Sequence, residues 1–146
     1  MDEKLTKSRK DGAPYRLFDP GHPALGSLAS DAVAGLALAA ADVAVIIGPD
    51  NSIVDVAFHD ASLAQYGVEG WVGKVVHDTV TPESIAKLDS LLAEARGNQF
   101  ARRREINHLC SGSADLPFRD CAVPLGLDGT VLITGSDLRI ISEQQQ

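Results

Sequence analysis

The sequence contains few cysteines and no long apolar run. Its two cysteines, Cys110 and Cys121, are too few for the disulfide framework that a small secreted domain needs. The most apolar stretch, residues 32–47, is interrupted by Gly35 and Asp42 and is too short to cross a bilayer. The N-terminus is charged, and no apolar signal-peptide core follows it. We therefore expect a cytoplasmic protein without a membrane partner.

Basic residues are also scarce. The chain has 13 Lys and Arg against 20 Asp and Glu, which gives a formal net charge of -7. An acidic surface repels phosphate backbones, so we do not expect this chain to bind DNA by itself. The one basic run, residues 102–104, lies in a predicted strand, where alternation sends Arg103 to the opposite face from its neighbours. We interpret it as a solvated strand that pairs with nearby carboxylates.

The length of 146 residues fits one compact domain with tails. Residues 1–26 are polar and rich in turn-forming residues, and we predict a flexible N-terminal arm there. The domain itself is predicted over residues 27–136. Residues 137–146 begin a helix that ends in three glutamines, with Asp137 as its candidate cap. We expect this helix to continue as a linker in a longer protein.

The first predicted helix covers residues 27–41 and is unusually apolar. Ser30 can cap it, and Asp31 in the first turn suits the helix dipole. The helix is apolar around much of its circumference, and a single small domain rarely covers both sides of such a helix. We therefore predict an interface with a second copy or a partner protein. Its residues are Val33, Leu36, Ala37 and Ala40, which share one helical face, and Leu38, which lies off that face.

A β-hairpin and a second long helix follow. Residues 42–47 form a short β-branched run that indicates a buried strand, and residues 53–58 form the returning strand. Between them lies the turn sequence Gly-Pro-Asp-Asn. Residues 59–73 indicate short helices and loops. The clearest helix covers residues 81–96, with Thr81 as cap and Pro82 at its first position. Its apolar stripe is Ile85, Leu88, Leu91, Leu92 and Ala95.

Three more strands are predicted over residues 100–109, 116–125 and 131–134. The order of strands and helices indicates an α+β protein with an antiparallel sheet. At this length, the order is that of a PAS fold. We predict a five-stranded antiparallel sheet with helices on one face, preceded by the N-terminal helix and followed by the start of a linker helix.

Specific motifs support this fold. The sequence Gly135-Ser136-Asp137-Leu138-Arg139 is similar to the motif that ends many PAS domains, and we predict Asp137, Leu138 and Arg139 as a signal exit motif. The chain from about residue 25 to residue 146 resembles the first PAS domain of PpsR/CrtJ-type repressors. The matching segments are residues 25–28 (LGSL), 40–44 (AADVA), 55–58 (DVAF), 70–74 (GWVGK), 78–84 (DTVTPES), 106–108 (INH), 116–119 (LPFR) and 137–146.

The resemblance implies an oligomeric repressor of photosynthesis genes that responds to oxygen, redox state or light. In that family, DNA is bound by a C-terminal helix-turn-helix, which this chain lacks. Its own role would be dimerisation or higher homo-oligomerisation, docking of an antirepressor-type protein, and transmission into the linker helix. The alternative is a ligand-sensing PAS input domain of a signalling protein such as a histidine kinase.

The two cysteines invite a redox hypothesis. A tight turn near residues 111–114 would place Cys110 opposite Asp115 and Cys121 opposite about Arg104. The thiols would then be six ladder steps apart, about 20 Å at roughly 3.3 Å per step, too far for an intrachain disulfide. Arg104 beside Cys121 could stabilise a thiolate, which makes Cys121 a candidate redox thiol. We favour the alternative that Cys121 is a small core residue.

No catalytic or cofactor pattern emerges. His59, His77 and His108 lie in separate elements without metal-ligand spacing. The long helix has no histidine of the kind that a haem-binding PAS domain uses, and neither cysteine lies where a flavin photoreceptor needs one. Phosphate loops and nucleophile elbows are absent from the sequence. We expect no metal, no cofactor and no enzyme activity.

Overall fold

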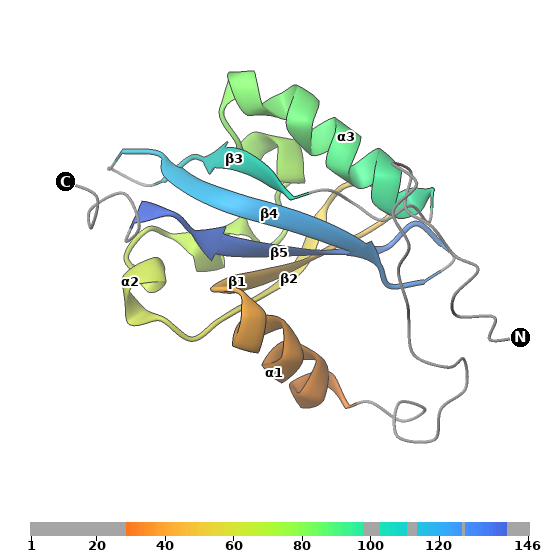
Figure 1. The fold of residues 1–146 in the computed structure, drawn as a ribbon, viewed down its shortest axis with the longest axis horizontal. Helices are drawn as coiled ribbons and strands as arrows, with labels where there is room; N and C mark the ends of the chain where they lie inside the picture. Colours follow the sequence, from red (N-terminus) through yellow and green to blue (C-terminus); the bar gives the residue numbers. More distant parts are fainter. Residues whose placement is uncertain (1–28, 98–102, 111–113, 127, 140–146) are drawn as a thin grey trace, which may run out of the picture.

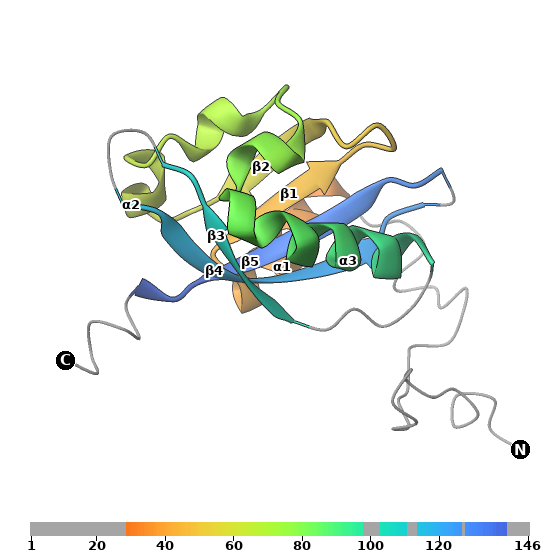
Figure 2. The same ribbon diagram turned by 90° about the horizontal axis from the view of Figure 1, so that it is seen from above.

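A computed structural model describes residues 29–97, 103–110, 114–126 and 128–139 of this chain. Its five strands form one antiparallel sheet in the order β2-β1-β5-β4-β3 (Figures 1 and 2). This confirms the predicted α+β architecture of a PAS-like fold. The elements are α1 (Ser30–Ala40), β1 (Val43–Ile47), β2 (Ile53–Phe58), α2 (Ala61–Ala64), the 3₁₀ helices η3 (Val68–Trp71), η4 (Val76–Thr79) and η5 (Pro82–Ser84), α3 (Ile85–Arg96), β3 (Arg104–His108), β4 (Leu116–Pro124) and β5 (Val131–Asp137).

The first hairpin forms where the sequence predicts it. The turn between β1 and β2 is closed by Asn51, which donates its amide to the carbonyl of Gly48 at 2.9 Å and adopts a left-handed φ of 70°. Asparagine tolerates this conformation better than most residues. The carboxylate of Asp50 accepts the amide of Ser52 at 3.0 Å and completes the turn. A register shift between Ile46 and Ile47 marks a β-bulge in the pairing of the two strands.

One face of the sheet and the helices packed on it enclose the core. Alternate residues of β3, β4 and β5 point into this core, as the period of a strand requires. The buried side of α3 and the segment from α2 to η4 cover them. The core includes Leu63, Val68, Trp71, Leu88, Leu91, Leu92, Ile106, Phe118 and Val131.

The long helix begins differently from the prediction. Residues Pro82–Ser84 form a tight 3₁₀ turn before the α-helix starts at Ile85. The hydroxyl of Thr81 does not cap the backbone but donates to Oγ of Ser84 at 3.2 Å, and that oxygen accepts the amide of Asn107 at 3.0 Å. Ile85 is 37% exposed, so the predicted stripe is wrong at this position and right at the other four.

The strands of the C-terminal half differ from their predicted limits. The strand β3 begins at Arg104, whereas its predicted start at residues 100–102 lies outside the described residues. The strand β5 is longer than predicted and ends at Asp137, inside the exit motif. Gly135 makes this extension feasible, because a Cβ there would lie 2.6 Å from Oδ1 of Asp120 on β4. The rest of the predicted linker, residues 140–146, is outside the described residues, as are the predicted arm and the first residues of the predicted N-terminal helix.

The helix α1 lies across the other face of the sheet from α3 (Figure 1). It begins at Ser30 with Ala29 as its N-cap, and no side chain caps it, so the predicted capping role of Ser30 is wrong. Asp31 occupies the first turn as predicted. Among the described residues, no helix is long and apolar enough to cross a membrane.

Candidate interaction surface and exit motif

The helix α1 contributes no buried residue to the chain, although it is almost entirely apolar. Its side toward the sheet is only half-buried, at Val33, Ala37 and Leu38. Leu36 is 63% exposed, the highest value among the exposed large apolar residues of the described chain, and Ala40 is exposed as well. The five residues predicted as one interface therefore divide between two sides of the helix.

The side of α1 that faces away from the sheet is made of small residues around one leucine. Its exposed residues repeat at helical spacing and form what we call the outer stripe: Ala32, Gly35, Leu36, Ala39 and Ala40. A Cβ on Gly35 would meet no atom within 4 Å, so nothing in the described chain needs a glycine there. A mid-helix glycine costs about 0.5–1 kcal/mol relative to alanine. A stripe this smooth would let another helix approach closely.

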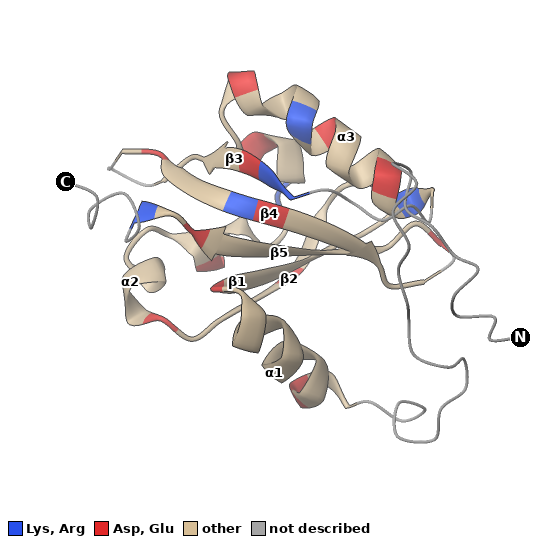
Figure 3. Cartoon of the chain, viewed as in Figure 1, with Lys and Arg blue, Asp and Glu red and all other residues tan. Residues whose placement is uncertain are grey.

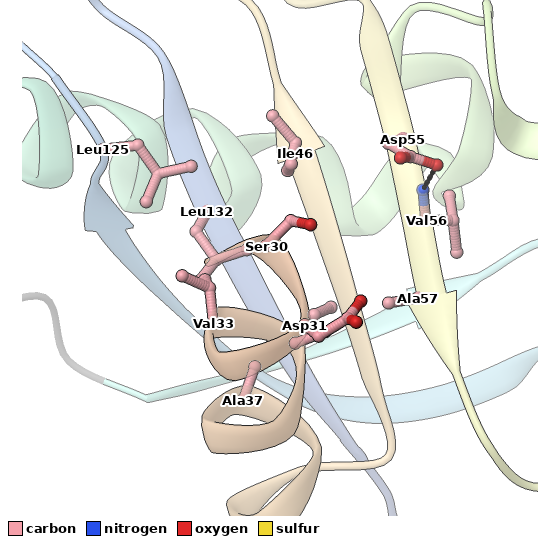
Figure 4. A pocket seen from close by; sticks show the side chains of 12 residues that line it. Ser30, Asp31, Val33, Ala37, Ile46, Asp55, Val56, Ala57, Leu125 and Leu132 are labelled. Carbon is pink, nitrogen blue, oxygen red and sulfur yellow. Dashed lines mark hydrogen bonds between the residues drawn. The ribbon is translucent and has the colours of Figure 1, made fainter. Parts of the chain in front are cut away.

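Between α1 and the sheet runs a groove of about 510 Å³ (Figure 4). Its floor is the outer face of the sheet and includes Ile46 of β1 and Leu132 of β5. Two carboxylates, those of Asp31 and Asp55, line the groove, and Figure 4 shows the Asp31 side chain directed toward β2. The complete lining is Ser30, Asp31, Val33, Ala34, Ala37, Ala44, Ile46, Asp55, Val56, Ala57, Leu125 and Leu132.

Charge is distributed unevenly around this surface (Figure 3). Asp31 is the single charged residue of α1. No Lys or Arg in the described part of the chain pairs with Asp31 or Asp55. The surface is therefore apolar with negative charge at the N-terminal end of α1.

The junction between α1 and β1 is bonded directly to the exit motif. Asp42, two residues after the end of α1, donates its amide to the carbonyl of Gly135 at 2.8 Å. Its Oδ2 accepts the amide of Asp137 at 2.7 Å. One residue thus holds both the backbone of β5 and the first residue of the exit motif.

Two side chains of the exit motif also bind each other. The guanidinium of Arg139 binds the carboxylate of Asp137 through Nε at 3.0 and 3.1 Å and through Nη2 at 2.5 Å. The guanidinium carbon also lies 4.2 Å from the ring centre of Tyr66, a cation–π contact. The hydrogen bonds to Asp137 raise the pKa of Arg139 above its ordinary value. The amide of Leu138 donates to the carbonyl of Pro117 at 3.0 Å, so all three predicted residues are fastened to the domain.

The helix that Asp137 is predicted to cap continues into residues 140–146, which lie outside the described residues. Oδ1 of Asp137 accepts the amide of Arg139, two residues on, at 2.9 Å, which is the geometry of an N-cap. Its side chain is 6% exposed, so this hydrogen bond is protected from water. The sequence motif located this group, but it gave no sign of Asp42 or Tyr66 as its partners.

The cysteines are positioned differently from the prediction. The register pairs Arg104 with Asp120, one residue away from the predicted partner, so Arg104 does not face Cys121. Arg104 instead binds Glu94 of α3 at 2.6 and 3.1 Å. Cys121 pairs with Thr134 of β5 on the outer face of the sheet and is half-buried, not a core residue.

Cys110 is the thiol nearer the exit motif. It packs against the core, and burial raises the pKa of its thiol, while the charge of Arg139 acts in the opposite direction. From the observed register, Cys110 and Cys121 are seven ladder steps apart, about 23 Å at roughly 3.3 Å per step. This separation, one step longer than predicted, still excludes a bridge within one folded chain.

A buried hydrogen-bonded pair of polar side chains that the sequence did not reveal lies inside the core. His108 of β3 is 5% exposed and Asp120 of β4 is 1% exposed, and Nε2 of His108 lies 2.8 Å from Oδ2 of Asp120. The indole of Trp71 stacks on the imidazole with a centroid distance of 5.1 Å. Nδ1 of His108 is buried without a hydrogen-bond partner. Only the register, which brings two polar residues to the inner face of neighbouring strands, could identify this pair.

His77 has a different partner. Nε2 of His77 lies 2.6 Å from Oδ1 of Asp89 on the surface of α3. In the described ranges, no three His, Cys, Asp or Glu side chains gather in a way that could hold a metal ion.

No family model matches the chain. Its sequence is 27% identical over 123 residues to Protein CrtJ of Rhodobacter capsulatus. The match covers 84% of this chain and 26% of CrtJ, so the chain spans about a quarter of the length of that protein. The similarity confirms the resemblance to PpsR/CrtJ-type repressors that the motifs indicated.

Proposed function

We propose that this chain is the N-terminal PAS interaction module of a transcriptional repressor of photosynthesis genes that responds to redox state or light. Its role is to dimerise and to transmit the state of its α1 surface into the helix that follows Arg139. It has no catalytic role. DNA binding belongs to a helix-turn-helix elsewhere in the repressor, which agrees with the excess of acidic residues in this chain.

The observation that carries this proposal is the exposed apolar surface of α1. A helix without a fully buried residue is packed only loosely on its own domain, and a leucine that is 63% exposed gains free energy when a partner covers it. A two-fold pairing of α1 with its copy is the simplest cover. The outer stripe offers the contact, with Gly35 at its centre.

The bond between Asp42 and Asp137 supports the second half of the proposal. A shift of α1 on binding a second copy, or an antirepressor-type protein, would move the junction at Asp42. Because Asp42 holds the amide of Asp137, that movement would reach the exit motif through one residue. The contact is a physical route for coupling between the two sites.

Sedimentation equilibrium of the chain and two variants tests the dimer. We expect the wild-type chain to be a dimer and the Leu36→Glu variant to be a folded monomer, because an unpaired charge buried in a dimer interface is costly. We also expect Gly35→Ala to weaken association about tenfold or more, although alanine stabilises the isolated helix. Val72→Glu is the matched control, because Val72 is 49% exposed and lies outside α1.

Two outcomes would contradict dimerisation through the outer stripe. One is a wild-type chain that stays monomeric at high concentration. The other is a Leu36→Glu variant that remains dimeric, which would move the interface to another surface. Circular dichroism of each variant shows whether the domain is still folded.

A further inference from the structure

The groove between α1 and the sheet needs an occupant of its own. The outer stripe faces away from the sheet, so a second copy bound there leaves the groove open. The helix has 11 residues, a central glycine and no side-chain N-cap. Helices shorter than about 12–15 residues are marginal without tertiary packing. A segment that fills the groove would bury the inner side of α1 at Val33 and Ala37.

We propose that residues 14–18 of this same chain, Pro-Tyr-Arg-Leu-Phe, dock in this groove. The basic side chain of Arg16 would face the carboxylates of Asp31 and Asp55, and the apolar residues on either side of it would contact the floor and the inner side of α1. The proposal is independent of the regulatory role of the protein.

The short distance in sequence between residues 14–18 and the start of α1 favours this segment as the occupant. The chain enters α1 through Ala29, and the next two residues, Ser30 and Asp31, already line the groove. The ten residues 19–28 can span up to about 33 Å, since an extended chain covers at most about 3.3 Å per residue. The helix is about 16 Å long at 1.5 Å per residue. The spacer holds two prolines and two glycines, so it can reverse direction and bring residues 14–18 over α1.

Charge favours the same segment. Residues 1–28 hold five Lys and Arg against four Asp and Glu, whereas residues 29–146 hold eight against sixteen. The groove carries two carboxylates without a described basic partner, in a domain that is otherwise strongly acidic. The N-terminal segment is therefore the part of the chain whose charge suits the groove.

The apolar content of residues 14–18 suits the groove as well. Tyr15, Leu17 and Phe18 surround Arg16, which gives two aromatic rings and one aliphatic side chain within four residues. A volume of about 510 Å³ lies within the range of clefts that hold compact ligands of a few such groups. Another segment of residues 1–28 with a basic residue between large apolar ones does not exist.

Hydrogen exchange of α1 and β2 provides the test, in a chain carrying Leu36→Glu so that pairing through the outer stripe does not contribute. We expect deletion of residues 1–26 to speed exchange of the α1 amides at least tenfold, and Arg16→Glu to speed it several-fold. Lys7→Glu is the matched control, because it makes the same charge change outside residues 14–18, and it should have no effect. Adding Asp31→Lys to Arg16→Glu should restore part of the protection.

The proposal is overturned if deletion of residues 1–26 leaves exchange of α1 unchanged, or if Lys7→Glu acts as strongly as Arg16→Glu. Mixing labelled complete chain with unlabelled truncated chain distinguishes docking within one chain from docking onto a partner. Protection that transfers to the truncated chain would contradict docking within one chain.

Discussion

Oδ2 of Asp42 accepts the backbone amide of Asp137 at 2.7 Å, across 95 positions of the sequence. Asp42 follows the C-terminal end of α1, and Asp137 is the last residue of β5. The contact therefore joins the candidate dimerisation helix to the exit motif without passing through the core. We propose that a change at either end reaches the other through this contact.

Replacement of Asp42 should loosen the exit motif. Asp42→Ala leaves the amide of Asp137 without its acceptor in a half-buried site, and we expect a loss of about 1 kcal/mol in the free energy of unfolding. Asp42→Asn keeps an acceptor oxygen and should retain most of the stability. Urea denaturation measures the loss, and faster hydrogen exchange at Leu138 and Arg139 locates it. Equal effects of the two variants would show that charge, not the hydrogen bond, matters at this position.

Gly135→Ala should destabilise the domain by about 1–3 kcal/mol, the usual cost of overpacking. The new Cβ would lie 2.6 Å from Oδ1 of Asp120 and 3.1 Å from Cγ1 of Val43. Gly70→Ala is the matched control, because a Cβ there meets no atom within 4 Å. Thermal unfolding of both variants checks the difference. A Gly135→Ala variant as stable as the control would mean that Asp120 moves aside at no cost.

The buried pair of His108 and Asp120 should respond very differently to single and double replacement. Asp120→Ala leaves the imidazole of His108 without a partner in the core, and an unsatisfied buried polar group costs about 1–3 kcal/mol. Replacing both residues by leucine should recover much of that loss, since two apolar side chains need no partners. A double-mutant cycle in urea provides the coupling energy. Additive losses would show that the two residues do not depend on each other.

Cys110 should be a weak nucleophile near neutral pH. Burial raises the pKa of its thiol, so the thiolate fraction is smaller than for an exposed cysteine, and the rate of alkylation should rise only at higher pH. Iodoacetamide labelling of a Cys121→Ser variant, followed by mass spectrometry across a pH series, isolates this thiol. A free cysteine in a short peptide is the reference. Labelling of folded Cys110 as fast as this reference at pH 7 would contradict the expectation.

The same labelling tests the distance between the two cysteines. With the thiols about seven ladder steps apart and on opposite faces of the sheet, we expect no disulfide within one chain. The intact mass of monomeric protein under non-reducing conditions should not change when a reductant is added. A gain of two hydrogens on reduction would mean that the register of β3 and β4 is not the one in the folded chain.

Local chemistry was sufficient for most of the secondary structure. The turn from Gly48 to Asn51 was evident because its residues are ones that favour turns. The strand β2 has the predicted limits because turn-forming or polar residues mark both of its ends. The stripe of α3 was visible because four of its apolar residues face one core. These features depend on neighbours within a few positions, which the sequence displays directly.

Contacts between distant segments were decided only by the tertiary structure. A one-residue difference in register moved Arg104 from Cys121 to Asp120, because strand pairing is set by the whole sheet. The burial of His108 depends on the same register. The apolar composition of α1 indicated an interface, but only the packing of the sheet divided its residues into the outer stripe and the side that lines the groove. The link between Asp42 and Asp137 joins residues that no local pattern relates, since it exists only where β1 and β5 lie side by side.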